Sequence, residues 1–181
     1  MADTDLHTPR LLLRDIAPGD VDAVHAYAGD PEVCRFMVWG PNTLDDTRAF
    51  VAEQLVAAAA PDRRTHNRLI VHAGSGQVIG GIELRLESPA NQRGDFGYIL
   101  RRDHWGQGYA TEASRAVLDL GFGQLGLHRI TATCDPGNTA SARVLEKSGL
   151  RREGLMRQHL RRGGQWRDSL LYAVLASDER P

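Results

Sequence analysis

The pattern of apolar and polar positions divides the chain into a helical first third and a later part in which strands and helices alternate. A short apolar run over residues 10–14 is suited to a strand, and helical spacing follows over residues 20–28 and 44–60. Asp20 stands at the position of a helix cap, and Pro61 predicts the end of the second helix. We therefore expect a strand followed by two helices.

The rest of the chain has a strand-rich pattern bounded by turn residues. Apolar runs over residues 69–71, 78–86 and 96–100, separated by a glycine-rich turn and a polar loop, predict three antiparallel strands. With seven strands in all, the pattern predicts a mixed α/β fold of the α+β class with one central sheet. The remaining elements are helices at 108–122 and 139–147 and strands at 129–134, 150–155 and 166–175.

Length, charge and cysteine content narrow the class of protein. With 181 residues, 41% of them apolar, the chain suits one hydrophobic core, so we expect a single domain over residues 1–181. A net charge of -1 gives no general electrostatic reason to expect nucleic-acid or membrane binding. Neither a secretory leader nor a membrane-spanning apolar run is present, which predicts a cytoplasmic protein. Cys34 and Cys134 lie far apart without companions at metal-ligand spacing, so we predict neither a disulfide nor a metal site.

The most informative segment is residues 104–113, with the sequence HWGQGYATEA. It joins a predicted strand to a helix, so several free backbone amides face one way at the positive end of the helix dipole. Gly106 and Gly108 leave room for an anion, Ala110 is small, and Thr111 adds a hydroxyl. The segment predicts a phosphate-binding turn, with a helix entry that serves only packing as the alternative. A Walker loop lacks its lysine here, and a dinucleotide fingerprint needs Gly or Ala in place of Thr111.

Several motifs in a fixed order resemble one known family. They are TPRLLLR at residues 8–14, Asp30–Val33 ahead of Trp39, Gly97-Tyr98, the glycine-rich turn, and NTASARVLEKSG at residues 138–149. In this order the chain resembles the GCN5-related N-acetyltransferase (GNAT) superfamily, and within it the branch of the ribosomal-protein N-terminal acetyltransferases RimJ and RimL. The resemblance spans nearly the whole chain. It implies a V-shaped, mostly antiparallel seven-stranded sheet flanked by helices, in which two central parallel strands diverge.

The resemblance also implies acetyl-CoA as cosubstrate and assigns residues to it. The diverging strands would admit the pantetheine arm, with a bulge at Gly97 on the first of them. Asn138 would hydrogen-bond the arm or serve as a helix cap, and Arg143 would reach a phosphate or lie on a solvated helix face. Pantetheine pairing falls to Ile99 and Leu100, and diphosphate binding to the backbone amides of Trp105, Gly106, Gln107, Gly108, Tyr109 and Ala110, with Thr111 nearby.

Two positions depart from the superfamily pattern. Trp105 stands where most members have Gln or Arg, a change associated with the RimJ and RimL branch. Leu145 stands where many members have a tyrosine that protonates the departing thiolate. Ser141, one helical turn earlier on the same face, is the replacement that the resemblance implies, with an ordinary small helix residue as the alternative.

An amine must lose a proton before it attacks a thioester, so a base is also needed. Glu83 and Asp95, on neighbouring strands, are the candidate carboxylates, and each is alternatively a solvent-facing strand residue. A strand amide near Tyr98 or Ile99 would meet the charge that develops on the thioester oxygen. Phe36, Trp39 and Tyr98 are the expected walls of the acceptor site, although aromatic residues of this kind also serve as buried anchors.

These assignments predict direct transfer of the acetyl group to an amine without a covalent enzyme intermediate, because no cysteine, histidine and acid set is recognisable. Deprotonation at pH 7 costs about 1 kcal/mol for a peptide α-amine and about 4.6 kcal/mol for lysine, which favours a protein N-terminus as acceptor. A small-molecule amine such as an antibiotic or aminoacyl compound, and a non-catalytic CoA-binding module, stay open as alternatives. The arginine-rich residues 151–167 would attract acidic groups or RNA, or form solvated strand edges. A homodimer is compatible with the sequence.

Overall fold

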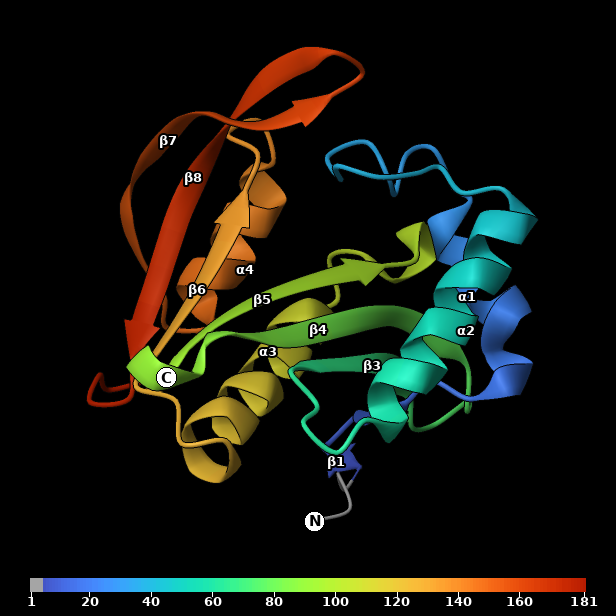
Figure 1. Ribbon diagram of the computed structural model, residues 1–181, viewed down its shortest axis with the longest axis horizontal. Helices are drawn as coiled ribbons and strands as arrows, with labels where there is room; N and C mark the ends of the chain where they lie inside the picture. The colour runs from blue at the N-terminus through green and yellow to red at the C-terminus, as the bar shows by residue number, and fades with distance from the viewer. Residues whose placement is uncertain (1–4) are drawn as a thin grey trace.

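The computed structural model describes residues 5–181, which form one eight-stranded sheet with helices on both faces (Figure 1). The strand order is β1-β2-β3-β4-β5-β6-β8-β7, and every neighbouring pair is antiparallel except β5 and β6. The predicted mixed, mostly antiparallel sheet is therefore confirmed. The strands are β1 (Leu6–His7), β2 (Leu11–Asp15), β3 (Thr65–His72), β4 (Val78–Ser88), β5 (Arg93–Leu100), β6 (Arg129–Cys134), β7 (Arg151–Arg162) and β8 (Gln165–Leu175), and the helices are α1 (Val21–Ala28), α2 (Leu44–Ala59), α3 (Tyr109–Asp119) and α4 (Thr139–Lys147).

The sheet has one strand more than predicted. The additional strand, β1, is two residues long and pairs with β2, with Leu6 opposite Leu13. Two residues are too few to show an alternating pattern, which is why the sequence does not reveal this strand. The hairpin of β7 and β8 is also longer than predicted, because both strands continue to a tight turn at Gly163 and Gly164.

The helices begin and end close to their predicted limits. A 3₁₀ turn precedes α1, and the Asp20 carboxylate accepts the backbone amide of Ala17 at 2.7 Å instead of capping α1. Thr43 caps α2 by accepting the amide of Asp46, and α2 ends before Pro61 as predicted. The predicted helix 108–122 is α3 followed by a π turn. Among the described residues, no helix combines the length and the apolar character needed to cross a membrane.

Two apolar clusters hold the helices against opposite faces of the sheet. The larger cluster joins α3 to the sheet and includes Phe96 and Leu84. The smaller one lies under α1 and α2 and includes Val24 and Val51. Successive side chains of a strand point to opposite faces. The residues of β4 and β5 two positions away from Leu84 and Phe96 therefore face α3 as well, and the residues between them face α1 and α2.

The two central strands separate halfway along their length (Figure 1). The parallel pairing covers only Arg93–Asp95 of β5 against Arg129–Thr131 of β6. Beyond it, β5 and β6 diverge, which confirms the predicted V-shaped opening. The predicted bulge at Gly97 is wrong, because the ladder with β4 passes through Gly97, opposite Glu83, without a shift in register. The opening therefore comes from the end of β5–β6 pairing and not from a bulge.

Candidate active site

The predicted phosphate turn follows β5 after a short 3₁₀ turn (Arg102–His104) and leads into the N-terminus of α3. Gly106 and Gly108 have φ values of 74° and 83°, which favour glycine, and a Cβ at Gly106 would meet open space. The backbone amides of residues 106–111 donate to no acceptor within residues 5–181. A run of free amides at the positive end of a helix is a geometry suited to a phosphate.

The side chains of the turn contribute less than their amides. The amide of Trp105 donates to the carbonyl of Arg102 at 3.2 Å, so the free run starts one residue later than predicted. The Trp105 indole Nε1 donates to the carbonyl of Leu100 at 2.9 Å and ties the turn to the end of β5. Tyr109 and Ala110 are buried in the larger apolar cluster, so only their backbone amides face the site. Trp105 thus supports the turn in place of the usual Gln or Arg.

The free edge of β5 faces the gap between the diverging strands. The Arg101 amide donates to the carbonyl of Ile79, on β4, at 2.8 Å. In an antiparallel ladder, the backbone N–H and C=O groups of every second residue point toward the same neighbouring strand. The backbone groups of Ile99 therefore point toward β4, opposite Gly81. Those of Tyr98 and Leu100 point into the gap, which makes these two residues, rather than Ile99, the available partners for an extended ligand.

A pair of hydroxyl groups spans the gap on the α3 face. The Tyr98 hydroxyl and the Ser141 hydroxyl are 3.0 Å apart, and they come from β5 and from the first turn of α4. Burial raises the pKa of Tyr98 to about 12, although the hydrogen bond to Ser141 opposes this. Both groups therefore carry their protons at neutral pH. The sequence predicts Ser141 as the acid and Tyr98 as a wall of the acceptor site, and it does not predict the hydrogen bond between them.

Two of the other α4 residues, Asn138 and Leu145, have structural roles, and Arg143 has none among the described residues. The Asn138 side chain caps α4 by accepting the amide of Ser141 at 3.1 Å. Leu145 is buried in the larger apolar cluster, so it has taken the place of the usual tyrosine as a core residue. Arg143 is exposed on α4 and makes no hydrogen bond or ion pair within residues 5–181.

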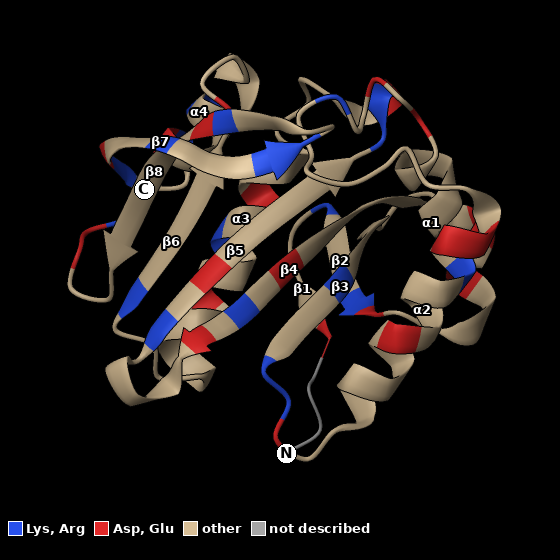
Figure 2. Cartoon of the chain, turned by 45° about the horizontal axis from the view of Figure 1, so that its top comes forward, with Lys and Arg blue, Asp and Glu red and all other residues tan. Residues whose placement is uncertain are grey.

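Two carboxylates lie on the opposite side of the sheet from this hydroxyl pair. Glu83 and Asp95 are diagonal neighbours on β4 and β5 and share the α1–α2 face, and Figure 2 shows acidic positions in both strands. Burial raises the pKa of Asp95 to about 6 against the opposing effect of Arg85, whose guanidinium is 3.3 Å away. Burial also raises the pKa of Glu83, and Asn67 donates to its carboxylate at 3.3 Å. Neither carboxylate is a fully solvated strand residue.

A small cavity lies where β6 ends. It has a volume of about 160 Å³ and is bounded by the loop after α1, the end of β6 and the β7–β8 hairpin. Phe36, one of the predicted acceptor-site residues, is part of its wall together with Val38. Trp39 is 38% exposed and lies outside the lining, so the structure brings Phe36 but not Trp39 to this cavity.

One arginine joins two walls of this cavity. The guanidinium of Arg162, at the tip of the hairpin, donates to the carbonyls of Cys34 at 2.9 Å, Arg35 at 2.6 Å and Gly40 at 3.3 Å. The sequence indicated an arginine-rich hairpin but not this contact, because the partners are more than a hundred residues away along the chain. Arg162 therefore holds the loop after α1 against the hairpin.

Both cysteines are free and buried. Burial raises the pKa of the Cys134 thiol to about 11 and also raises that of Cys34, so neither is a thiolate at neutral pH. No histidine hydrogen-bonds to either sulfur within the described part of the chain. In residues 5–181, no group of three or more His, Cys, Asp or Glu side chains is placed to hold a metal ion.

Comparisons with known proteins agree with this geometry. A family model described as an acetyltransferase (GNAT) domain matches residues 10–151. The uncharacterized N-acetyltransferase p20 of Bacillus licheniformis is 33% identical over 94% of this chain and 95% of its own length. The spermidine N(1)-acetyltransferase of Escherichia coli is 25% identical over 90% of this chain and 84% of its own length.

Two solved structures show the same fold. A GNAT-family acetyltransferase from Bacillus anthracis superposes with a TM-score of 0.86 at 33% identity, covering 97% of this chain and all of its own. The RimL ribosomal L7/L12 α-N-protein acetyltransferase, solved with coenzyme A, gives a TM-score of 0.85 at 20% identity, with 97% and 100% coverage. With the family model spanning most of the chain, these comparisons and the diverging-strand sheet show that the protein belongs to the GNAT family of N-acetyltransferases.

Proposed function

We propose that the protein transfers the acetyl group of acetyl-CoA directly to the amino-terminal α-amine of a peptide or protein. The observation that carries this proposal is the gap between β5 and β6, which has the proton-carrying pair Tyr98 and Ser141 on one face and the carboxylates Glu83 and Asp95 on the other. A thioester in this gap would have a proton donor on its sulfur side and a proton acceptor on its amine side.

The turn before α3 fits the diphosphate of acetyl-CoA. The free amides of residues 106–111 would bind its oxygens, and the space beside Gly106 accommodates them. The carbonyl of Tyr98 and the amide of Leu100 would pair with the pantetheine arm along the edge of β5. Arg143, which is exposed on α4, stays a candidate for a phosphate contact, and the second function of Asn138 as a ligand of the arm stays a prediction.

Asp95 is our choice for the base, acting through a water molecule. Its pKa of about 6 keeps it ionised at neutral pH while making it a stronger base than an exposed aspartate. Glu83 is the second candidate, and its hydrogen bond from Asn67 leaves one carboxylate oxygen for another partner. The amide of Tyr98 points into the gap, where it would donate to the thioester oxygen as negative charge develops.

The hydroxyl pair would protonate the departing sulfur. A single proton moves from one of the two hydroxyls to the thiolate, and the other hydroxyl donates a hydrogen bond that stabilises the resulting oxygen. This division of labour explains how the chain dispenses with the tyrosine that Leu145 replaces. With both thiols buried and protonated, we also propose that no acetyl-cysteine intermediate forms on Cys34 or Cys134.

The acceptor assignment rests on the cost of deprotonation and on the shape of the cleft. An α-amine gives up its proton for about 1 kcal/mol at pH 7, within reach of a carboxylate and a water molecule. Val38, in the cavity wall, is 49% exposed, and the adjacent Trp39 is 38% exposed, so the loop after α1 presents an apolar rim on its side of the cavity. A peptide whose first residue enters the cavity would contact this rim with its following residues.

A small polyamine is the second candidate acceptor. Glu83 and Asp95 place two carboxylates on the α1–α2 face, of which Asp95 is paired with Arg85, and carboxylates of this kind would bind an amine cation (Figure 2). The relationship to the E. coli spermidine N(1)-acetyltransferase favours the same class of acceptor. The RNA alternative loses support, because Arg162 is engaged in binding the loop after α1.

A mass-spectrometric screen tests the acceptor. The protein is incubated with acetyl-CoA and one amine at a time, either a peptide from a set with varied N-termini or spermidine. Products heavier by one acetyl group are then counted. We expect turnover of peptides that disappears when their N-terminus is blocked. Turnover of spermidine alone would establish the second candidate, and CoA binding without turnover of any amine would show a binding module.

Steady-state kinetics test direct transfer. Because both substrates must be bound together, double-reciprocal plots at several acceptor concentrations are expected to intersect. Parallel lines, or an acetylated cysteine found by peptide mapping, would contradict direct transfer. The cytoplasmic location and the homodimer stay predictions, to be checked by cell fractionation and light scattering.

A further inference from the structure

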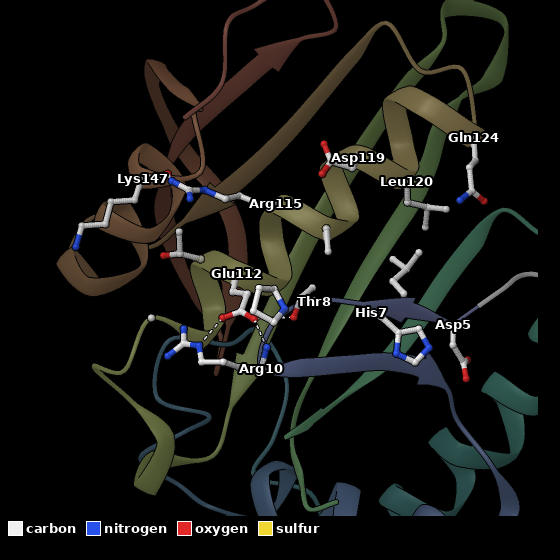
Figure 3. Close-up of a pocket in the computed structure, with 15 residues that line it drawn as sticks. Asp5, His7, Thr8, Arg10, Glu112, Arg115, Asp119, Leu120, Gln124 and Lys147 are labelled. Atoms are coloured by element: carbon white, nitrogen blue, oxygen red, sulfur yellow. Dashed lines mark hydrogen bonds and ion pairs between the residues drawn. The ribbon is translucent and has the colours of Figure 1, made fainter. Parts of the chain in front are cut away.

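The segment of residues 8–10, which lies near the chain's N-terminus, contacts the first turn of α3 (Figure 3). The Glu112 carboxylate accepts the Thr8 hydroxyl at 2.6 Å, the Arg10 amide at 2.9 Å and the Arg10 Nε at 2.7 Å. The Arg10 Nη1 donates to the carbonyl of Gln107 at 3.0 Å. We call these four contacts the Arg10 clamp. It joins two motifs that lie about a hundred residues apart in the sequence.

The clamp has an electrostatic consequence for the phosphate turn. Glu112 lies in the first turn of α3, next to the amides that face the proposed diphosphate site. Burial acts to raise its pKa, but the hydrogen bonds from Thr8 and Arg10 outweigh burial and leave the pKa below its usual value. An ionised carboxylate would repel a bound diphosphate unless its charge were neutralised. The guanidinium of Arg10 supplies that neutralisation at 2.7 Å.

The clamp also orients one of the free amides. The peptide bond between Gln107 and Gly108 is planar and trans, so its C=O and N–H point in opposite directions. Because Arg10 binds the Gln107 carbonyl, the Gly108 N–H is held pointing away from that bond. A preoriented amide loses little freedom when it binds a ligand, which increases affinity.

One nitrogen of Arg10 is left over. Its Nη2 makes no hydrogen bond or ion pair within residues 5–181, and the side chain is 45% exposed. This nitrogen is 3.4 Å from the position that a Cβ on Gly108 would take. Arg10, Gly108 and Thr111 also line one groove of about 790 Å³ along α3. The free donor therefore lies beside the turn, at the side of an open groove.

We propose that Arg10 is part of the cofactor site: it neutralises Glu112, positions the Gly108 amide, and donates from Nη2 to a phosphate oxygen of CoA. This inference rests on the proposed function, since it requires that the turn binds the CoA diphosphate. It gives the TPR stretch at residues 8–10 a role in ligand binding in addition to strand formation.

Calorimetry with a truncated ligand tests the proposal. Pantetheine lacks the phosphates of CoA, and its affinity is measured by displacement against CoA. Arg10→Ala is expected to weaken CoA binding roughly 10-fold or more and pantetheine binding less than about 2-fold. The reason is that only CoA has phosphates that can accept the charge-assisted hydrogen bond from Arg10. An equal loss for both ligands, or unchanged CoA affinity, would overturn the proposal. Absence of CoA binding by the unchanged protein would instead overturn the proposed function.

Two further variants separate the electrostatic role from a structural one. In Arg10→Ala the Glu112 carboxylate loses its guanidinium partner and its charge is no longer neutralised. Adding Glu112→Gln is therefore expected to recover at least about 3-fold in CoA affinity, whereas a loss of structure alone would not be rescued. Arg14→Ala is the matched control, because Arg14 lies in the same N-terminal region but makes its contacts away from the turn. Its guanidinium donates two hydrogen bonds of 2.7 Å to the Asp20 carboxylate. It is expected to lower thermal stability without changing CoA affinity. A matching loss of CoA affinity in Arg14→Ala would overturn the assignment.

Discussion

The two ends of the gap between β5 and β6 are built in different ways. The phosphate turn at 105–111 is a run of consecutive residues whose backbone amides carry the chemistry, and two glycines with positive φ set its shape. The proposed acceptor end is assembled from the loop after α1, the end of β6 and the β7–β8 hairpin, and Arg162 ties the loop to the hairpin. A local motif therefore builds the proposed cofactor end, and contacts between distant segments build the proposed acceptor end.

This difference predicts how each end responds to substitution. Changes in the phosphate turn should weaken every reaction of the protein equally, because all acceptors use the same donor. Changes at the acceptor end should alter one substrate's KM and leave acetyl-CoA unaffected. The variants below test this separation, starting with the largest expected effect.

Gly108→Glu is expected to abolish acetyl-CoA binding, a loss of at least about 100-fold, because it adds a carboxylate to the turn proposed to bind the diphosphate. Calorimetry measures the affinity. The φ of 83° at Gly108 strains any other residue, so Gly108→Ala is the matched control that carries the strain without the charge. Equal affinities for the two variants would show that strain, and not the phosphate site, explains the loss.

Asp95→Asn is expected to lower kcat/KM about 100-fold if Asp95 is the base. In the unchanged protein, kcat/KM should fall as the pH drops through about 6, where Asp95 becomes protonated, and the variant should lack this decline. A pH–rate profile for both proteins provides the measurement. Glu83→Gln is the comparison variant, and a larger loss there than in Asp95→Asn would move the base to Glu83.

The same substitution, Asp95→Asn, is expected to raise the stability of the fold while it lowers activity. Because burial raises the pKa of Asp95 in the folded state, ionisation destabilises the fold above pH 6, and this cost disappears below about pH 4. Asp95→Asn should therefore be more stable than the unchanged protein at pH 8, by on the order of 2 kcal/mol, with the difference shrinking as the pH falls. Denaturant unfolding at pH 8 and pH 4 measures it. A variant less stable at pH 8 would contradict the raised pKa.

Sequence reasoning located what depends on neighbouring residues. Most strands and all four helices follow from local periodicity, and the phosphate turn follows from Gly106 and Gly108 with the helix behind them. Contacts between residues far apart in the sequence could not be predicted in this way. The hydrogen bond between Tyr98 and Ser141 joins residues 43 apart, and the bonds of Arg162 join segments more than 120 apart. Such contacts depend on the order and register of strands, which alternation in one strand does not determine.

Tyr98→Phe is expected to lower kcat about 10-fold with the KM for acetyl-CoA changed less than about 2-fold, because the hydroxyl acts only on the departing sulfur. Ser141→Ala should behave similarly, and the double variant should be little worse than either one, since the two hydroxyls act as a pair. Thiol release at saturating substrates measures kcat. Tyr172→Phe removes a hydroxyl bonded to Glu146 away from the gap and should leave kcat unchanged.

Arg162→Gln tests the acceptor end directly and has the smallest expected effect. Loss of its bonds to the carbonyls of Cys34, Arg35 and Gly40 should loosen the loop after α1 and raise the acceptor KM about 5-fold, while the KM for acetyl-CoA stays within about 2-fold. Arg161→Gln is the matched control, because the neighbouring guanidinium donates only to Gly164 and holds no loop. Steady-state kinetics with each substrate varied in turn separates the two KM values. If both rise together in Arg162→Gln, the acceptor end is not built independently of the cofactor end, and the contrast between a local and a long-range site does not hold for this protein.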